Sequence, residues 1–376
     1  MIYFDNSATT YPKPPQVIKQ ACRALKQDSF NSGRGGYSKS LAAAEKIYNV
    51  REKIGAMFHA QPENIVFTKN CTEALNIAIK GSVKKGDHII ISSLEHNSVS
   101  RVAEKLSADG IIDYDFAAFS FDDNETINNF KAKIKKNTTL VVCMHSSNVF
   151  GVCFPIAKIG KLCRDNGIRF IVDAAQGAGV ADIDMMRDNI DVLCSAGHKC
   201  LFGPMGTGFM AVRQGVKLDT LFEGGTGSKS LSLAQPEFLP DRFEAGTLNN
   251  PGIIGLGEGI DFINARGREN IYSHEMKTAQ LLYNTLSRTD GVKLYTAFPE
   301  KNKYMPIISF NFKDYSSEKT ADLLNHYAIC VRAGFHCSPL AHRHFGTLST
   351  GTVRISPGYF NTEKECFGFV NVLKKL

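Results

Sequence analysis

The sequence predicts an α/β fold built on a mostly parallel β-sheet that helices cover on both faces. Short apolar runs rich in β-branched residues recur between residues 65 and 212, with helical stretches between them. These runs are continuously apolar instead of alternating with polar residues, which is typical of strands buried on both faces. The chain has 376 residues, enough for one large and one smaller domain.

The predicted strands of this sheet are, in chain order, residues 65–68, 88–92, 140–145, 169–172, 191–194 and 207–212. Strands that alternate with helices in this way form βαβ units and a largely parallel sheet. Because open sheets of this kind bind ligands beyond the carboxyl ends of their strands, polar residues that directly follow a strand are candidates for a functional site.

The composition changes after the last of these strands. Residues 223–251 are rich in Gly, Ser, Asn and Pro, which predicts long loops, whereas residues 255–288 predict helix and a new strand region begins at residue 307. We therefore expect a large α/β domain over residues 14–255. Residues 1–13 and 256–376 would form a small α+β domain.

Composition and charge exclude several classes of protein. Hydrophobic residues make up 43% of the chain and charged residues 22%, which excludes a disordered or collagen-like protein. The net charge is 44 − 37 = +7, but Lys and Arg never form a run of five, so no nucleic-acid partner is expected. No apolar window approaches 18 residues, so we expect no membrane span.

The same features indicate a cytoplasmic protein. Asp5 interrupts the first apolar stretch before a signal-peptide core can form. None of the ten cysteines forms a C-x-x-C pair, and several lie in apolar runs, where buried reduced thiols are expected.

Two charged side chains follow predicted strands. Asp173 comes directly after the run 169–172, where a carboxylate must be solvated, cap a helix or face a cationic ligand. Lys199 lies in a glycine-rich turn after the run 191–194, where desolvation and nearby positive charge can lower the pKa of an amine enough for Schiff-base chemistry. From the residues alone, Asp173 could also be a helix cap, and Lys199 could equally be a surface lysine.

Two further segments could complete a site at the same edge of the sheet. Cys71 and Thr72 begin a predicted helix whose free amides can hold a phosphate, although an ordinary helix N-cap has the same pattern. His96 follows the run 88–92 and would bring a flat imidazole to this edge. Neither G-x-x-x-x-G-K-[ST] nor a helix-opening G-x-G-x-x-G is present, so a nucleotide site is not predicted.

Taken together, these segments resemble the fold-type I pyridoxal-phosphate enzymes of the class V aminotransferase group, and within it the cysteine desulfurase and selenocysteine lyase family. The matching motifs span nearly the whole chain in the family's order: Tyr3-Phe-Asp-Asn-Ser-Ala-Thr-Thr10, Glu95-His96, Ser147-Asn-Val-Phe-Gly151, Val172-Asp-Ala-Ala-Gln176, Gly197-His-Lys199, Arg242-Phe-Glu-Ala-Gly-Thr247 and Arg332-Ala-Gly-Phe-His-Cys337. The last motif is similar to the compact cysteine loop of the group II desulfurases.

The resemblance implies pyridoxal 5'-phosphate as the cofactor and assigns its contacts. Lys199 would bind the cofactor covalently and later move the substrate Cα proton. Asp173 would pair with the pyridine nitrogen and keep it protonated, which makes the ring an electron sink. His96 would stack on the ring face and take part in catalysis, and Gln176 would lie near the ring hydroxyl.

The phosphate contacts implied by the resemblance come from two subunits. The amide of Cys71, the hydroxyl of Thr72 and His198 would bind the phosphate within one subunit. Thr247 would reach the phosphate of a second subunit, which implies a homodimer.

The resemblance also implies the substrate contacts. Arg354 matches the family's arginine for the substrate carboxylate, with an ordinary surface ion pair as the alternative; Asn148 and Arg332 are further substrate contacts, and Asn148 also a cofactor contact. Cys337 would take the substrate sulfur as a persulfide. That step needs a thiolate, and His336 and Arg332 would supply positive charge that lowers the thiol pKa.

A zinc site made of Cys337, His336, His342 and His344 is a rival interpretation of the same segment. Its Cys-x₄-His-x-His spacing lacks the paired ligands of structural zinc motifs, so no metal is expected.

Two positions depart from the family's pattern. Three residues before the lysine, where the family usually has Ser or Thr, this chain has Ala196, with Ser195 one place off. The loop over residues 31–37 has glycine where group II members often carry a histidine. The resemblance therefore defines the phosphate contacts and the substrate preference less closely than it defines the cofactor.

The predicted function is that of a cysteine desulfurase, which converts L-cysteine to L-alanine and passes the sulfur to an acceptor protein for iron–sulfur or other thio-cofactor assembly. The alternatives are a selenocysteine lyase acting on L-selenocysteine, another class V aminotransferase, and a non-catalytic pyridoxal-phosphate-binding regulator. Cys337 argues against the last of these.

Overall fold

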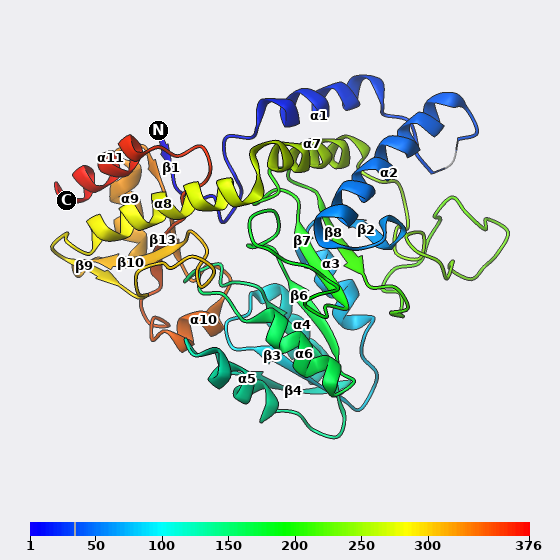
Figure 1. Cartoon of the computed structure of the whole chain (residues 1–376), viewed down its shortest axis with the longest axis horizontal. Helices are drawn as coiled ribbons and strands as arrows, with labels where there is room; N and C mark the ends of the chain where they lie inside the picture. Colours follow the sequence, from blue (N-terminus) through cyan, green and yellow to red (C-terminus); the bar gives the residue numbers. More distant parts are fainter. Residues whose placement is uncertain (34) are drawn as a thin grey trace.

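The computed structural model describes residues 1–33 and 35–376 and is centred on a seven-stranded sheet (Figure 1). The strand order is β2-β8-β7-β6-β5-β3-β4. The strands are β2 (Ile65–Thr68), β3 (Asp87–Ser92), β4 (Ile112–Ala117), β5 (Thr138–Met144), β6 (Arg169–Asp173), β7 (Val192–Ala196) and β8 (Gly208–Val212). The pairs from β4 through β7 are parallel, and β8 is antiparallel to both β2 and β7. The prediction of a mostly parallel sheet is confirmed.

Strand β4 is the one strand of this sheet that the sequence did not predict. Its residues read Ile-Asp-Tyr-Asp-Phe-Ala, and it pairs only with β3 at the edge of the sheet. An edge strand is covered less completely, so Asp113 is exposed and Asp115 only half-buried. The continuous apolar run that marks an inner strand is therefore absent here.

Helices cover both faces of the sheet, as predicted. On one face lie α3 (Cys71–Lys80) and α4 (Asn97–Ala108), and on the other lie α2 (Ser38–Phe58), α5 (Asp123–Lys131), α6 (Ile156–Asp165) and α7 (Asn250–Arg266). Successive strand residues point to opposite faces, so Phe170 and Val172 of β6 join one core cluster while Ile171 joins the other. Helix α1 (Pro15–Gln27) packs on α7 beyond the sheet.

A second sheet lies to one side of the large sheet, at the end of the molecule that carries both chain termini (Figure 1). It is antiparallel, with strands β12 (Arg332–Gly334), β13 (Thr352–Ile355), β10 (Ile308–Phe312) and β9 (Val292–Leu294) in that order. With α8 (Arg268–Leu286), α9 (Ser317–Asn325) and α11 (Glu363–Leu373) it encloses a third apolar cluster. Strand β1 (Ile2–Tyr3) pairs with β11 (Ile329–Cys330), so the N-terminal segment starts beside this sheet.

The predicted helical stretch over residues 255–288 forms α7 and α8, which are separated at Gly267. This glycine has a φ of 81°, a conformation that residues with a Cβ rarely adopt, so the chain turns there. The predicted domain boundary at residue 255 falls inside α7, and the division into two domains stays a prediction.

Residues 223–249 contain neither helix nor strand, as their composition predicted. Among residues 1–33 and 35–376, no helix combines the length and the apolar content needed to cross a membrane. The loop over residues 31–37, which is expected to affect substrate preference, includes Arg34. This residue lies outside the described residues, so the expectation is not tested there.

Candidate active site

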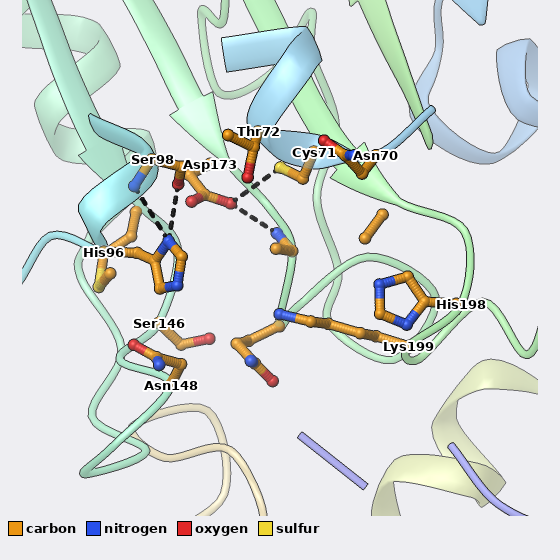
Figure 2. Close-up of a pocket in the computed structure, with 14 residues that line it drawn as sticks. Asn70, Cys71, Thr72, His96, Ser98, Ser146, Asn148, Asp173, His198 and Lys199 are labelled. Carbon is orange, nitrogen blue, oxygen red and sulfur yellow. Dashed lines mark hydrogen bonds between the residues drawn. The ribbon is translucent and has the colours of Figure 1, made fainter. Parts of the chain in front are cut away.

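A recess lies beyond the carboxyl ends of β5, β6 and β7, where α3 and α4 begin (Figure 2). The residues that line it are Asn70, Cys71, Thr72, His96, Ser98, Met144, Ser146, Asn148, Asp173, Ala175, Gln176, Ala196, His198 and Lys199. They come from five separate segments of the chain. The recess thus brings together all the predicted cofactor residues except Thr247.

Asp173 ends β6 and presents its carboxylate to the recess. One carboxylate oxygen, Oδ1, accepts hydrogen bonds from the Ala175 amide (2.9 Å) and from the Cys71 thiol (3.4 Å). Burial and the adjacent Asp173 raise the pKa of the Cys71 thiol well above its usual value, so this thiol stays protonated and can donate. Oδ2 accepts no hydrogen bond from the described residues, which leaves this oxygen for a cationic ligand.

Lys199 reaches into the same recess from the turn after β7, and Figure 2 shows its amine pointing toward the centre, below Asp173. Burial lowers the pKa of the amine, while the nearby Asp173 acts in the opposite direction. Within the described chain, the amine has no carboxylate at ion-pair distance. A neutral, unpaired amine is the form that can attack an aldehyde.

The first turn of α3 offers two free backbone amides to the recess. The side chain of Asn70, the N-cap residue, accepts a hydrogen bond from the Glu73 amide (2.9 Å). The amides of Cys71 and Thr72 find no such partner among the described residues, and the exposed Thr72 hydroxyl lies beside them. Together they form an anion-binding end of the recess, because helix N-termini attract negative charge.

His198 faces the recess close to this helix end (Figure 2). Its Nδ1 atom is buried and has no hydrogen-bond partner among the described residues. Burial, with help from the neighbouring Lys199 and Lys13, lowers the pKa of the ring to about 4, so the imidazole is neutral near pH 7. An unpartnered ring nitrogen at this position fits a contact to a bound group.

Ala196 lines the recess with a methyl group where the family's pattern has a hydroxyl. Ser195 does not replace that hydroxyl, because adjacent residues of a strand point to opposite faces. Its Oγ is buried, has no hydrogen-bond partner within residues 1–33 and 35–376, and does not line the recess.

His96 is the N-cap residue of α4, and its Nδ1 accepts hydrogen bonds from the amide of Ser98 (3.1 Å) and from its hydroxyl (2.8 Å). Accepting from an amide requires an unprotonated Nδ1, which places the single ring proton on Nε2. Burial lowers the pKa of His96 to about 4. The ring is therefore neutral and fixed in orientation, as a stacking partner must be.

Gln176 and Asn148 are buried residues of the recess wall. The amide nitrogen of Gln176 donates to the backbone oxygen of Ser7 (3.0 Å). The side-chain amide of Asn148 donates to the backbone oxygen of His336 (2.9 Å) and accepts from the Ser338 hydroxyl (2.7 Å). Asn148 thus holds the residues on either side of Cys337 against the large sheet.

Thr247 is not part of this recess. It lies on the exposed loop before α7 and borders a separate hollow together with Lys69 and Glu73. Its assignment to the phosphate site of a second subunit stays a prediction.

Cys337 is exposed on the turn between β12 and α10 (Pro339–His344). Its backbone oxygen accepts a hydrogen bond from the Asn97 amide (2.7 Å) at the start of α4. His336 and Cys337 both have positive φ angles, 51° and 57°. The turn is thus fastened to the mouth of the recess through its backbone while the thiol remains free.

The expectation that His336 supplies positive charge to Cys337 is wrong. Burial lowers the pKa of His336 to about 2, and the ring packs parallel to His342 with 5.6 Å between ring centres. A neutral imidazole cannot stabilise a thiolate by charge. Of the two cations expected to act on Cys337, only Arg332 is left, and it is exposed on β12.

The rival zinc interpretation finds no support in the geometry. His342 is buried and bonds through Nδ1 to the Thr347 hydroxyl (2.7 Å), whereas Cys337 is exposed. No three or more His, Cys, Asp or Glu side chains of the described chain come together in an arrangement that could hold a metal ion.

Arg354 lies on β13 and is buried, so it is not the surface residue of the alternative interpretation. Its guanidinium pairs with Asp5 (2.6 Å) and donates to the backbone oxygen of Asn148 (2.7 Å). The Nε atom is buried and finds no partner in the part of the chain that the structure describes. The assignment to a substrate carboxylate stays a prediction, and Nε is the guanidinium nitrogen for which the described residues provide no partner.

The sequence reasoning missed three polar residues of the recess: Asn70, Ser98 and Ser146. Asn70 could have been found, because Asn before a helix that follows a strand is an N-cap signature. Nothing local marks Ser98 or Ser146, since Ser at such positions is common in ordinary loops and helix starts.

Comparisons with known proteins agree with this geometry. The profile of the family described as aminotransferase class-V matches residues 2–367. A probable cysteine desulfurase of Methanothermobacter thermautotrophicus is 34% identical over 97% of this chain and 92% of its own, and one of Pyrococcus abyssi is 32% identical over 100% and 94%. The apo structure of a cysteine desulfurase from Thermococcus onnurineus NA1 matches with a TM-score of 0.91 and 31% identity, over 100% of this chain and 94% of that one.

The chain belongs to the class V aminotransferase family. Enzymes of this family depend on pyridoxal phosphate, and the recess of this class V enzyme suits that cofactor. It offers an amine without a charged partner, a free carboxylate oxygen, a neutral ring and an anion-binding helix end, at Lys199, Asp173, His96 and the start of α3. The orphaned Nδ1 of His198 gives the phosphate a further contact.

Proposed function

We propose that this protein is a cysteine desulfurase, which converts L-cysteine to L-alanine and takes the sulfur onto Cys337 as a persulfide. The observation that carries this proposal is the position of Cys337. The exposed thiol lies on a turn that Asn97 and Asn148 hold at the mouth of the recess. Other class V enzymes that only exchange amino groups have no need of a thiol at this place, and relatives named cysteine desulfurases support the assignment.

The residues of the recess would divide the work as follows. Bound pyridoxal phosphate supplies an electron sink for the pair of electrons left when the substrate Cα proton departs. Asp173 keeps a negative charge beside the ring nitrogen and favours its protonated form. His96 presents a flat neutral face, and the amides at the start of α3 hold the phosphate.

Lys199 is the residue that moves the proton. Burial lowers the pKa of its amine, so a larger fraction is deprotonated and able to accept a proton near pH 7. The substrate carboxylate would be held by Arg354, whose Nε is unpartnered, and by neighbouring Asn148.

Cys337 completes the reaction from the small sheet. Its thiolate attacks the substrate sulfur, an S–S bond forms, and the Cβ–S bond of the substrate breaks. The electron pair of that bond stays with Cβ, which takes up a proton and becomes the methyl group of alanine. The products are alanine and an enzyme-bound persulfide, so atoms and electrons balance without an external oxidant.

We further propose a cytoplasmic homodimer that passes its sulfur to an acceptor protein for iron–sulfur cluster assembly. The exposed position of Thr247, away from its own recess, suits a contact to the phosphate site of a second subunit. All ten cysteines are free, which suits a reducing compartment. The persulfide on the exposed Cys337 would be accessible to an acceptor.

The test is an assay of the purified holoenzyme with L-cysteine, with and without a thiol reductant. We expect alanine in both cases, sulfide released chiefly with the reductant, and one extra sulfur on the Cys337 peptide by mass spectrometry. The exposed Cys22 peptide serves as the control and should stay unmodified.

Other outcomes would point to the alternatives. Alanine formed from L-selenocysteine but not from L-cysteine would indicate a selenocysteine lyase. Transfer of the amino group to a keto acid, with Cys337 unmodified, would indicate an aminotransferase and overturn the proposal.

A further inference from the structure

The backbone at Lys199 is held by donors from a distant part of the chain. The N-terminal strap, residues 5–13, runs from the small sheet to the recess and places Thr9, Thr10 and Lys13 against this turn. The backbone oxygen of His198 accepts from the Thr9 hydroxyl (3.0 Å), the Thr10 amide (3.1 Å) and the Lys13 amine (2.7 Å). The Thr10 hydroxyl lies 3.1 Å from the backbone oxygen of Lys199.

Lys13 sets the direction of the Thr10 hydroxyl proton in this group of hydrogen bonds. Its amine also donates to the Thr10 hydroxyl oxygen at 2.6 Å, so the hydroxyl proton must point elsewhere. The remaining acceptors are the two backbone oxygens, of which that of Lys199 is the nearer, at 3.1 Å against 3.3 Å. The ammonium group is the only charged donor of the set, and charge-assisted hydrogen bonds are the stronger ones.

Lys13 is a costly residue at this place. Its side chain is half-buried, and within the described chain no carboxylate lies at ion-pair distance from it. Burial lowers its pKa to about 8, so burying the cation opposes folding below that pH. An apolar side chain of similar length would avoid this cost, which indicates that the amine serves a purpose other than stability.

The strap also contacts other groups of the site. Gln176 donates to the backbone oxygen of Ser7, and Arg354 pairs with Asp5. One short segment therefore connects the predicted substrate arginine, a predicted cofactor contact and the turn that carries Lys199.

We propose that Lys13 is a positioning residue for Lys199, acting through the backbone oxygens of His198 and Lys199 together with Thr10. The inference rests on the proposed role of Lys199 as the amine that binds the cofactor. Lys13 fixes the direction in which the Lys199 side chain leaves the turn. Lys13 thereby places the Lys199 amine in the recess, near Asp173, before the cofactor binds.

The experiment compares Lys13→Met, which keeps the length and loses the donors and the charge, with the matched control Lys19→Met on the exposed face of α1. Each apoprotein is melted, titrated with pyridoxal phosphate to obtain a Kd, and reduced with borohydride so that the modified lysine can be mapped. For Lys13→Met we expect a Kd about tenfold higher, as the loss of one strong hydrogen bond would cause, with an apoprotein Tm that is unchanged or higher.

Thr10→Val is the second variant and removes only the hydroxyl that lies between Lys13 and Lys199. It should raise the Kd by about threefold, and Lys19→Met should leave both Kd and Tm unaltered.

An unchanged Kd in both Lys13→Met and Thr10→Val would overturn the inference. A Kd that rises only together with a fall in apoprotein Tm would also overturn it, because Lys13 would then be structural. If borohydride labels a lysine other than Lys199 in the parent protein, the proposed function of the site fails instead, which keeps the two failures distinguishable.

Discussion

The cofactor recess and the turn that carries Cys337, between β12 and α10, hold their reactive groups in opposite ways. In the recess, Asp173 and His96 are fixed through their side chains, by the Ala175 and Ser98 amides. On the turn, the Cys337 thiol is exposed and only the backbone is tied down, by Asn97 and Asn148.

This difference suits two tasks. A cofactor needs rigid groups in a water-poor site, because preorganised side chains avoid reorganisation during the reaction. In the proposed reaction Cys337 first meets the substrate and then an acceptor, so its thiol has to stay free while its position is held. The two successive left-handed residues, His336 and Cys337, show that the fold accepts local backbone strain to present this thiol.

Replacing Lys199 should give the largest effect and should disable the whole recess. Lys199→Ala removes the residue proposed both to bind the cofactor covalently and to carry the proton, so we expect turnover of L-cysteine to fall about ten-thousandfold or more. Borohydride reduction should then leave no labelled lysine. Lys85→Ala, at an exposed surface position, is the control, and a Lys199→Ala enzyme with parent activity would contradict the assignment.

Replacing Cys337 should separate the turn from the recess. Cys337→Ala should lower desulfuration of L-cysteine by about a thousandfold, because Cys71, the other thiol that the described residues bring to this site, is buried and donates to Asp173. Cofactor affinity and the borohydride-labelled lysine should be unchanged, since Cys337 does not line the recess. Cys22→Ala is the exposed-cysteine control, and loss of cofactor in Cys337→Ala would show that the two regions are not independent.

A smaller effect is expected at the junction of the two regions, where Arg354 of the small sheet bonds to Asn148 of the recess. Arg354→Lys keeps a positive charge beside Asp5 but loses the planar fork. We expect the KM for L-cysteine to rise about tenfold while kcat changes little. If this KM stays at the parent value and Arg332→Lys raises it, the carboxylate site belongs to Arg332.

The smallest effect concerns the buried Glu95, which accepts a hydrogen bond from the amide of Met144 in the recess wall, and it appears in stability. Burial, with help from Asp173, raises the pKa of Glu95 to about 8, against about 4.3 in the unfolded chain. Between these pH values the folded protein binds a proton that the unfolded chain has released. Stability must therefore fall as pH rises from about 4 through 8.

Glu95→Gln keeps the oxygen that accepts from Ser92 and the Met144 amide but cannot ionise. Its Tm should decline less between pH 5 and 9 than that of the parent, by a few degrees in this range. Glu45→Gln, at an exposed position, serves as the control. Parallel curves of Tm against pH for Glu95→Gln and the parent would show that folding does not raise the pKa of Glu95.

Much of the recess could be predicted from sequence because its residues follow inner strands. Continuous apolar runs located β6 and β7, and the residues after them had to lie at the sheet edge. Strand β4 was missed because an edge strand lacks that pattern. The roles assigned to Lys199, Asp173 and Cys337 came from motif resemblance and remain predictions.

The sequence by itself determined the inner strands of the large sheet, their mostly parallel arrangement and the polar residues that follow them, because continuous apolar runs and the residues beside them are local features of the chain. Only the tertiary structure decided that His336 is neutral, that Arg354 pairs with Asp5 and that Lys13 reaches His198. Burial and contacts between segments nearly two hundred residues or more apart set the charge and the partners of these groups. No local pattern contains that information.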